Sequence, residues 1–417
     1  MEKSGKFRLT SLERNWILYD VGNSAFVLMV ATLIPIFFNA LAAAGGLSSV
    51  EYLAYWGYAS SAVTIITAVL SPILGTVADT KGFKKPIFIL CVFVGIVGCC
   101  AMGAVSAWLP FLVIFVIAKV GFSGSLVFYD SMLSDVTTPE RMDEVSSRGY
   151  AWGYIGSCIP FVVCLGLVLG AGSIGISQMT ALNLALLLTA AWWLLTTLPL
   201  LKSYKQLYYV EVEKHAVRQS FARIGHTLRH LPEDKQVFWF LLAFFCYIDG
   251  VYTIIDMATA YGTALGLDTT GLLLALLVTQ IVAFPSALVF GRLSNKYPSA
   301  KLIPVCIAAY AGIAVFAFFL TRQWQFWVLA VIVGMFQGGV QALSRSHFAK
   351  IIPPEKSGEY FGLFDICGKG ASFLGTMIVS VGSQLTGSAN VGVGSLILLF
   401  IVGFVLFRVS CRQGETA

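Results

Sequence analysis

Long apolar segments, separated by short polar stretches, dominate this sequence of 417 residues. Each segment is about 18 to 28 residues long, the length that a helix needs to cross roughly 30 Å of hydrocarbon. Only 12% of the residues are charged, whereas soluble domains average about 25%. Barrel strands would be about ten residues long and strictly alternating, and no such pattern occurs. The chain is therefore predicted to be an all-α integral membrane protein.

The apolar segments predict twelve transmembrane helices. Their approximate bounds are 16–42, 52–78, 86–106, 110–132, 149–170, 179–200, 237–263, 271–291, 302–320, 325–345, 359–384 and 391–408. The first segment is too long for a signal peptide and contains Asp20, so we expect it to remain in the mature protein.

Nearly all of the 27 lysine and arginine residues fall at the two termini, in the central connection and in alternate loops. Short cytoplasmic loops are enriched in these residues, so both termini are predicted to be cytoplasmic. The loops account for the net charge of +6, and no nucleic-acid partner is implied.

Most of the nine cysteines lie in apolar segments and three of the four histidines lie in the central loop, so we expect neither disulfides nor a metal or cofactor site.

An internal repeat divides the chain. The segment from Ser71 to Ile87 is similar to the segment from Ala287 to Ile303, so that Gly291 follows Gly75 by 216 residues. The pair Pro139-Glu140 recurs as Pro354-Glu355, 215 residues later. We therefore predict two six-helix halves, 1–201 and 236–417, joined by a cytoplasmic linker, 202–235.

The first repeated segment resembles the loop signature of the major facilitator superfamily. The matching residues are Gly75, Asp79, Gly82, Lys84 and Lys85. In that superfamily the acid and the basic residues hold neighbouring cytoplasmic helix ends together in one conformation and release them in the other. Thr80 replaces the usual arginine, and the second copy has Asn295 and Pro298 instead of the acid and the second glycine. The resemblance thus implies a gate carried mainly by the first half; a basic inner loop with a glycine turn is the alternative. Arg345, at the inner end of the tenth segment, is assigned to the gate or to lipid headgroups.

Other motifs occur in both halves: YDVGNSAF (19–26), VSSRGYAWGYIG (145–156), YIDGVYTIIDMATAYG (247–262), GGVQALSRSHFAKIIPPEKSGEYFG (338–362) and GKGASFLG (368–375). Together they are similar to the vacuole-effluxer-like branch of the superfamily, named for a yeast protein that exports amino acids from the vacuole. The branch usually has tryptophan and alanine where Val21 and Gly22 stand, and Gly-Pro where Gly375-Thr376 stands. The substrate of one member is therefore not carried over to this chain.

This resemblance implies that the first, fourth, seventh and tenth helices line a central cavity. Charges inside membrane segments usually face such a cavity. The third, sixth, ninth and twelfth segments have no internal charges, and the other segments supply the candidate cavity charges: Asp20, Lys119, Asp249, Asp256, Asp365 and Lys369.

Helix rise places these charges at different depths. At about 1.5 Å per residue, Asp249 is roughly 18 Å from the inner end of its segment, and Asp256 is nearly 30 Å from it, close to the outer mouth. Lys119 and Lys369 are each roughly 14 Å deep, so we expect Asp249 to meet both lysines at one level. Asp249 would bind a proton or an amine, and the lysines would bind an anionic group. Asp249-Gly250 also predicts a local helix break.

Each candidate has a structural alternative. A buried ion pair would hold the halves together without binding solute. Asp365 and Lys369, one helical turn apart, would form a pair within one helix. Asp256 would simply be hydrated at the outer mouth, and Asp20 would cap the inner end of its helix.

Neutral side chains complete the candidate site. They are Asn23, Gln280, Gln337 and Gln341, which donate and accept hydrogen bonds, and Tyr19, Trp152 and Tyr154, which form aromatic walls. With 13% aromatic residues, each aromatic candidate has lipid-facing or internal packing as its alternative.

These features predict a monomeric secondary transporter of a small polar solute, such as an amino acid or related metabolite, in a bacterial inner membrane or an organellar membrane. Proton coupling is a hypothesis that rests on Asp249 and Asp256, because desolvation favours a protonated carboxyl group. A receptor or scaffold with the same fold is the alternative. A membrane enzyme is less favoured because no nucleophile, base and orienting group converge, and no phosphate-binding glycine-rich loop indicates ATP as the energy source.

Overall fold

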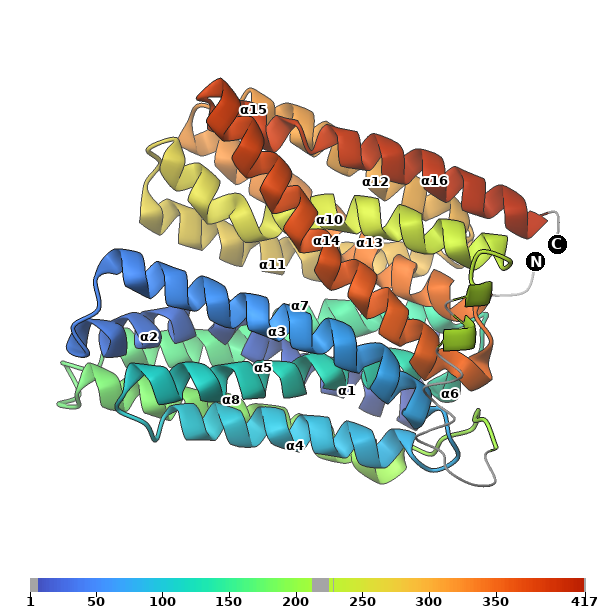
Figure 1. The fold of residues 1–417 in the computed structure, drawn as a ribbon, viewed down its shortest axis with the longest axis horizontal. Coiled ribbons are helices and arrows are strands. Elements are labelled where there is room, and N and C mark those ends of the chain that lie inside the picture. The colour runs from blue at the N-terminus through green and yellow to red at the C-terminus, as the bar shows by residue number, and fades with distance from the viewer. Residues whose placement is uncertain (1–6, 212–224, 228, 416–417) are drawn as a thin grey trace.

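The computed structural model describes residues 7–211, 225–227 and 229–415. These residues include twelve helical segments that are long and apolar enough to cross a membrane. Figure 1 shows the segments as two bundles, with the N-terminal half below the C-terminal half. The transmembrane fold predicted from the apolar segments is confirmed.

The N-terminal half contains six spans. The first consists of two helices, α1 (Ser11–Ala31) and α2 (Leu33–Ala44), and the others are α3 (Ser49–Ala78), α4 (Lys84–Met102), α5 (Trp108–Ser131), α7 (Met142–Leu169) and α8 (Gln178–Ser203). The short α6 (Leu133–Val136) follows α5. Thr10 caps α1 through a reciprocal pair of hydrogen bonds with Glu13, so Asp20, which lies two turns further in, is not the cap.

The C-terminal half repeats this order. Its spans are α10 (Lys235–Ala264), α11 (Thr269–Leu293), α12 (Ser299–Phe318), α13 (Gln323–Ile351), α14 (Ser357–Thr386, after the 3-10 turn η1, Pro354–Lys356) and the last span, which is divided into α15 (Ala389–Gly394) and α16 (Ile397–Glu415).

Two predictions about helix continuity are corrected. The first span is interrupted at Thr32, whose φ of −131° and ψ of −75° lie outside the helical region. Conversely, α10 continues through Asp249-Gly250 without a break. A Cβ atom on Gly250 would lie 2.5 Å from the Phe400 ring. The glycine therefore allows α16 to approach α10 closely and does not interrupt the helix.

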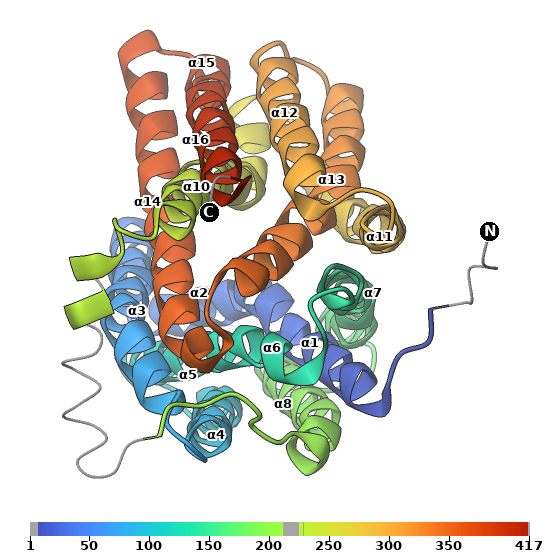
Figure 2. The same ribbon diagram turned by 90° about the vertical axis from the view of Figure 1, so that its right-hand side faces the viewer.

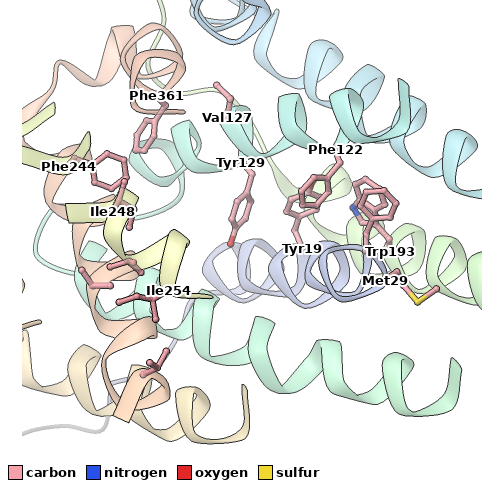
Figure 3. Packing of buried hydrophobic residues seen from close by; sticks show 14 of the residues in the cluster. Tyr19, Met29, Phe122, Val127, Tyr129, Trp193, Phe244, Ile248, Ile254 and Phe361 are labelled. Carbon is pink, nitrogen blue, oxygen red and sulfur yellow. The ribbon is translucent and has the colours of Figure 1, made fainter. Parts of the chain in front are cut away.

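Aromatic side chains fill the core of each half. In the N-terminal half, Tyr19 and Tyr129 lie between α1 and α5, and Trp16 stacks on Tyr129 with ring centroids 4.3 Å apart (Figure 3). In the C-terminal half, Phe244 stacks on Phe364 of α14 at 3.9 Å. Each half therefore has a packed interior of its own.

At one end of the molecule, a helix of one half crosses onto the other half. We call the end at which α1 begins and α16 ends the inner end, which its basic loops predict to be cytoplasmic. There α14 crosses from the C-terminal half onto α3 (Figures 1 and 2). The hydrogen bonds and ion pairs described next join the halves in this inner part of the bundle.

Candidate functional site: the gate and the central charges

The first gate joins the inner end of α3 to the start of α14. The carboxylate of Asp79 accepts hydrogen bonds from the backbone N–H groups of Gly358 (2.7 Å) and Glu359 (2.8 Å). A helix N-terminus attracts negative charge and has free N–H groups. A Cβ atom on Gly75 would lie 2.1 Å from the carbonyl oxygen of Gly358, so only glycine permits this approach.

Lys84 completes the first gate from the first turn of α4. It is fully buried, and its Nζ lies 3.8 Å from Asp79, 3.5 Å from Asp135 and 2.8 Å from the hydroxyl of Ser357. One cation therefore serves two carboxylates of its own half and a hydroxyl of the other half. Lys85 donates to the carbonyl oxygen of Tyr204 in the linker at 3.5 Å.

The second gate lies at the corresponding place between α11 and α7. Asn295 donates its side-chain N–H to Glu144 at 2.8 Å. A Cβ atom on Gly291 would lie 2.9 Å from that of Ser147. The expectation of a gate carried mainly by the first half therefore needs correction, because α7 supplies the acid that the second copy of the motif lacks.

Arg345 of α13 binds three residues of the N-terminal half. Its guanidinium donates to Asp130 at 2.9 Å and to the hydroxyl and carbonyl oxygens of Ser146 at 2.9 and 3.0 Å. The carboxylate of Asp20 lies 3.8 Å away. One turn further along α13, Lys350 forms an ion pair with Asp143 of α7 at 2.6 Å.

Two opposite charges, Lys119 and Asp256, act on each other across the halves. Lys119 of α5 lies over the Phe122 ring, 4.6 Å from its centroid, and has no carboxylate within ion-pair distance among the described residues. Asp256 of α10 is exposed, although eight residues separate it from the end of its helix, and its charge acts on Lys119 across the two halves. Asp256 is thus close enough to Lys119 for the two charges to interact.

Lys369 has a partner within its own helix. Its Nζ lies 2.6 Å from Asp365, and the hydroxyl of Ser71 donates to the same carboxylate at 2.7 Å. The pair thus connects α14 to α3.

Asp249 lies elsewhere. It is fully buried and accepts hydrogen bonds from the N–H of Gly375 (2.9 Å) and the hydroxyl of Thr253 (3.3 Å). The expected meeting of Asp249 with Lys119 and Lys369 is therefore wrong, because the carboxylate of Asp249 is held by Gly375 of α14 and Thr253 of its own helix.

The neutral candidates are dispersed. Tyr19 donates to Ser125, and Asn23 donates to the carbonyl oxygen of Tyr19, so both are used in packing α1. Trp152 is exposed and meets Phe284 of α11 edge to face, whereas Tyr154 is buried close to Gly338.

The three glutamines do not form one site. Gln280 and Gln337 line an apolar pocket inside the C-terminal half, and Gln341 is half-buried on α13. The described residues contain no group of three or more histidine, cysteine or acidic side chains that would hold a metal ion.

Asp130 is the main residue that the sequence analysis missed. A signal was present, because Arg345 follows Asp130 by 215 residues, the offset of the internal repeat. The same offset relates Asp135 to Lys350 and Glu144 to Glu359. Of these corresponding positions, Asp130 and Arg345 form an ion pair across the two halves.

The fold matches that of known transporters. The structure is similar to that of the human organic anion transporter MFSD10, with a TM-score of 0.72, 14% identity, and coverage of 95% of this chain and 99% of that one. It is also similar to the transporter FucP in its outward conformation, with a TM-score of 0.71, 17% identity, and coverage of 96% and 97%. These likenesses establish the fold, that of a major facilitator superfamily transporter.

The sequence defines the family. The model described as "Vacuole effluxer Atg22 like" matches residues 11–416, so the chain belongs to that family. It is 42% identical to the MFS-type transporter YxiO of Bacillus subtilis over 98% of this chain and 97% of that protein. It is 28% identical to autophagy-related protein 22 of Saccharomyces cerevisiae over 58% of this chain and 53% of that protein. The chain is thus a multi-pass membrane transporter and not an enzyme.

Proposed function

We propose that this transporter carries a small zwitterionic solute, such as an amino acid or related metabolite, by alternating access and in exchange with or together with protons. The observation that carries the proposal is the pair Lys119 and Asp256. They lie on opposite halves, their charges act on each other, and they form no ion pair among the described residues.

A zwitterion fits between these charges. Its carboxylate would bind Lys119 and its ammonium group would bind Asp256, so that each charge in the membrane interior gains a partner. Solute would then connect α5 with α10. The description of the family, which refers to a vacuole effluxer, supports a metabolite of this kind.

The closed inner gate supports alternating access. Transport requires the first gate, the second gate and Arg345 to release, while the outer parts of the halves approach each other. Asp256 is exposed in the present conformation, which is consistent with access from the outer end.

Asp249 and Asp256 are the carboxylates proposed for proton coupling. One oxygen of Asp249 is buried and has no hydrogen-bond partner among the described residues. A proton on that oxygen would remove the charge that burial disfavours. Gly375 would keep its hydrogen bond to the other oxygen.

Thermal stabilisation of the purified protein tests the solute class. Neutral amino acids should raise the melting temperature, and the shift should be lost in Lys119→Gln and Asp256→Asn. Lys296→Gln, in an exposed inner loop, is the matched control and should behave like wild type. Equal stabilisation of Lys119→Gln would refute the proposed solute site.

Transport into proteoliposomes tests proton coupling. A pH gradient should drive accumulation in the wild type, and Asp249→Asn should retain exchange of solute without gradient-driven accumulation. Full accumulation by Asp249→Asn would show that this carboxylate is not a coupling site.

A further inference from the structure

Arg345, Asp20 and Asp130 form a cluster whose charges do not balance. Both carboxylates contact the same nitrogen, Nη1 of Arg345, at 3.8 Å for Asp20 and 2.9 Å for Asp130. Only Asp130 is close enough to accept a hydrogen bond from it. Oδ2 of Asp20 is buried and accepts no hydrogen bond from the described residues.

Aromatic rings surround this cluster. The guanidinium carbon of Arg345 lies 4.3 Å from the ring centroid of Tyr150 and 4.7 Å from that of Trp16. Arg345 is only 2% exposed, so water screens the three charges poorly. An unbalanced carboxylate is costly in such surroundings.

The charge that opposes Asp20 comes entirely from the C-terminal half. From the N-terminal half, Asp20 meets only neutral or acidic titratable groups: Tyr19 on its own helix, Tyr129 and Asp130 on α5, and Tyr150 and Tyr154 on α7. On α14, Lys369 already neutralises Asp365, the acid whose charge reaches Asp130.

We propose that Asp20 takes up a proton when the inner gate opens, so that the Asp20–Arg345 contact couples protonation to the conformational change; this inference rests on the proton coupling proposed above. Opening the gate moves Arg345 away with α13. Asp20 and Asp130 would then remain on the N-terminal half as two neighbouring carboxylates without a cation. Such a pair cannot readily ionise twice, and it retains one proton.

The direction of the effect follows from the charges. Deprotonated Asp20 attracts Arg345 and favours the closed gate. Protonated Asp20 no longer does so, and Arg345 is then held through Asp130 and Ser146 alone. By linkage, a lower pH favours opening, and opening favours protonation to the same extent.

The distance across the inner gate, measured by spin labels as a function of pH, tests this directly. Suitable label sites are Phe83 and Tyr297, which are exposed in corresponding loops of the two halves. In the wild type the ratio of open to closed gate should change by up to about tenfold per pH unit, the slope for one proton. Asp20→Asn should favour the open gate at every pH and lose this slope, while Asp20→Glu should retain it.

Asp79→Asn is the matched control, because Asp79 is another buried carboxylate that bonds across the inner gate. The slope should survive in Asp79→Asn. A wild-type slope in Asp20→Asn, loss of the slope in Asp79→Asn alone, or a response to Na⁺ at constant pH would each overturn the inference.

Transport separates this inference from the proposed function. Asp20→Asn should still exchange solute, since Lys119 and Asp256 are unchanged, but should not accumulate it in response to a pH gradient. Failure of the wild type to transport any zwitterion would refute the proposed function. The label distances require no solute and would still decide the role of Asp20.

Discussion

The two gates have similar backbones and different chemistry. In each, a glycine near the end of one helix allows close contact with the first turn of a helix from the other half. Asp79 in the first gate is fully buried with Lys84 and accepts two backbone hydrogen bonds. Asn295 in the second gate is exposed and makes one hydrogen bond, to Glu144. The first gate therefore depends on buried charges, and the second depends mainly on helix contact.

The linker adds a further difference. The backbone N–H groups of Leu207 and Tyr208 donate to Asp135 at 2.9 and 3.0 Å, and the hydroxyl of Tyr204 donates to the same carboxylate at 2.6 Å. Val210 forms a β-bridge with Thr80 beside Asp79. This segment, 204–211, is the linker strap. It holds the acids of the first gate in place on the N-terminal side.

The largest effect is expected from Lys84→Met. Without the cation, Asp79 and Asp135 remain buried without their shared partner, which should cost about 3 to 5 kcal/mol of unfolding free energy. Lys301→Met, in the first turn of α12 of the second half, should change stability by less than about 1 kcal/mol because Lys301 is exposed. Melting temperatures of both variants in detergent would check the contrast, and equal losses would contradict it.

The next largest effect is expected from Asp79, in the pH dependence of stability. Burial raises the pKa of Asp79 to about 7 from the ordinary 3.8. The folded chain thus binds a proton that the unfolded chain releases, so this contribution to stability should decline as the pH rises from about 4 to 7. Asp79→Asn should flatten that part of the profile, as measured by thermal unfolding at fixed salt. Asn295→Ala, which removes no titratable group, should leave the profile unchanged.

Smaller effects should follow from the gate glycines. In Gly75→Ala the new methyl would meet backbone atoms of α14, whereas in Gly291→Ala it would meet the Cβ atom of Ser147. Overpacking of this kind costs about 1 to 3 kcal/mol. It would destabilise the closed conformation relative to the open one. Spin-label distances across the inner gate should therefore show more opening in Gly75→Ala than in Gly291→Ala. The reverse order would show that the second gate is the tighter one.

The smallest effect is expected from Tyr204→Phe. Loss of one hydrogen bond to Asp135 should reduce stability by about 0.5 to 1.5 kcal/mol, since two backbone donors remain. The strap should also become easier to cleave, which limited proteolysis would measure. Tyr208→Phe is the control, because the backbone of Tyr208 makes the contact and its side chain is partly exposed. Equal cleavage of both variants would argue against a specific role for the hydroxyl of Tyr204.

The sequence was sufficient to predict the twelve spans, because segment length and hydropathy are local properties. It did not predict the partners of Asp249. Helical spacing indicated that Asp249 and Asp256 lie on similar faces, but a glycine on another helix, Gly375, decided which one becomes buried. The contact of Asp130 with Arg345 likewise depends on how the two halves are positioned, and only the repeat offset indicated it.

The corresponding positions of the two halves carry opposite charges, Asp130 with Arg345 and Asp135 with Lys350. This sign reversal bears on assembly. A homodimer of the N-terminal half, arranged like the present halves, would place Asp130 against Asp130, and one of the C-terminal half would place Arg345 against Arg345. Halves expressed as separate chains should therefore associate as unlike pairs, and duplicated ancestors would have become mutually dependent once these charges diverged.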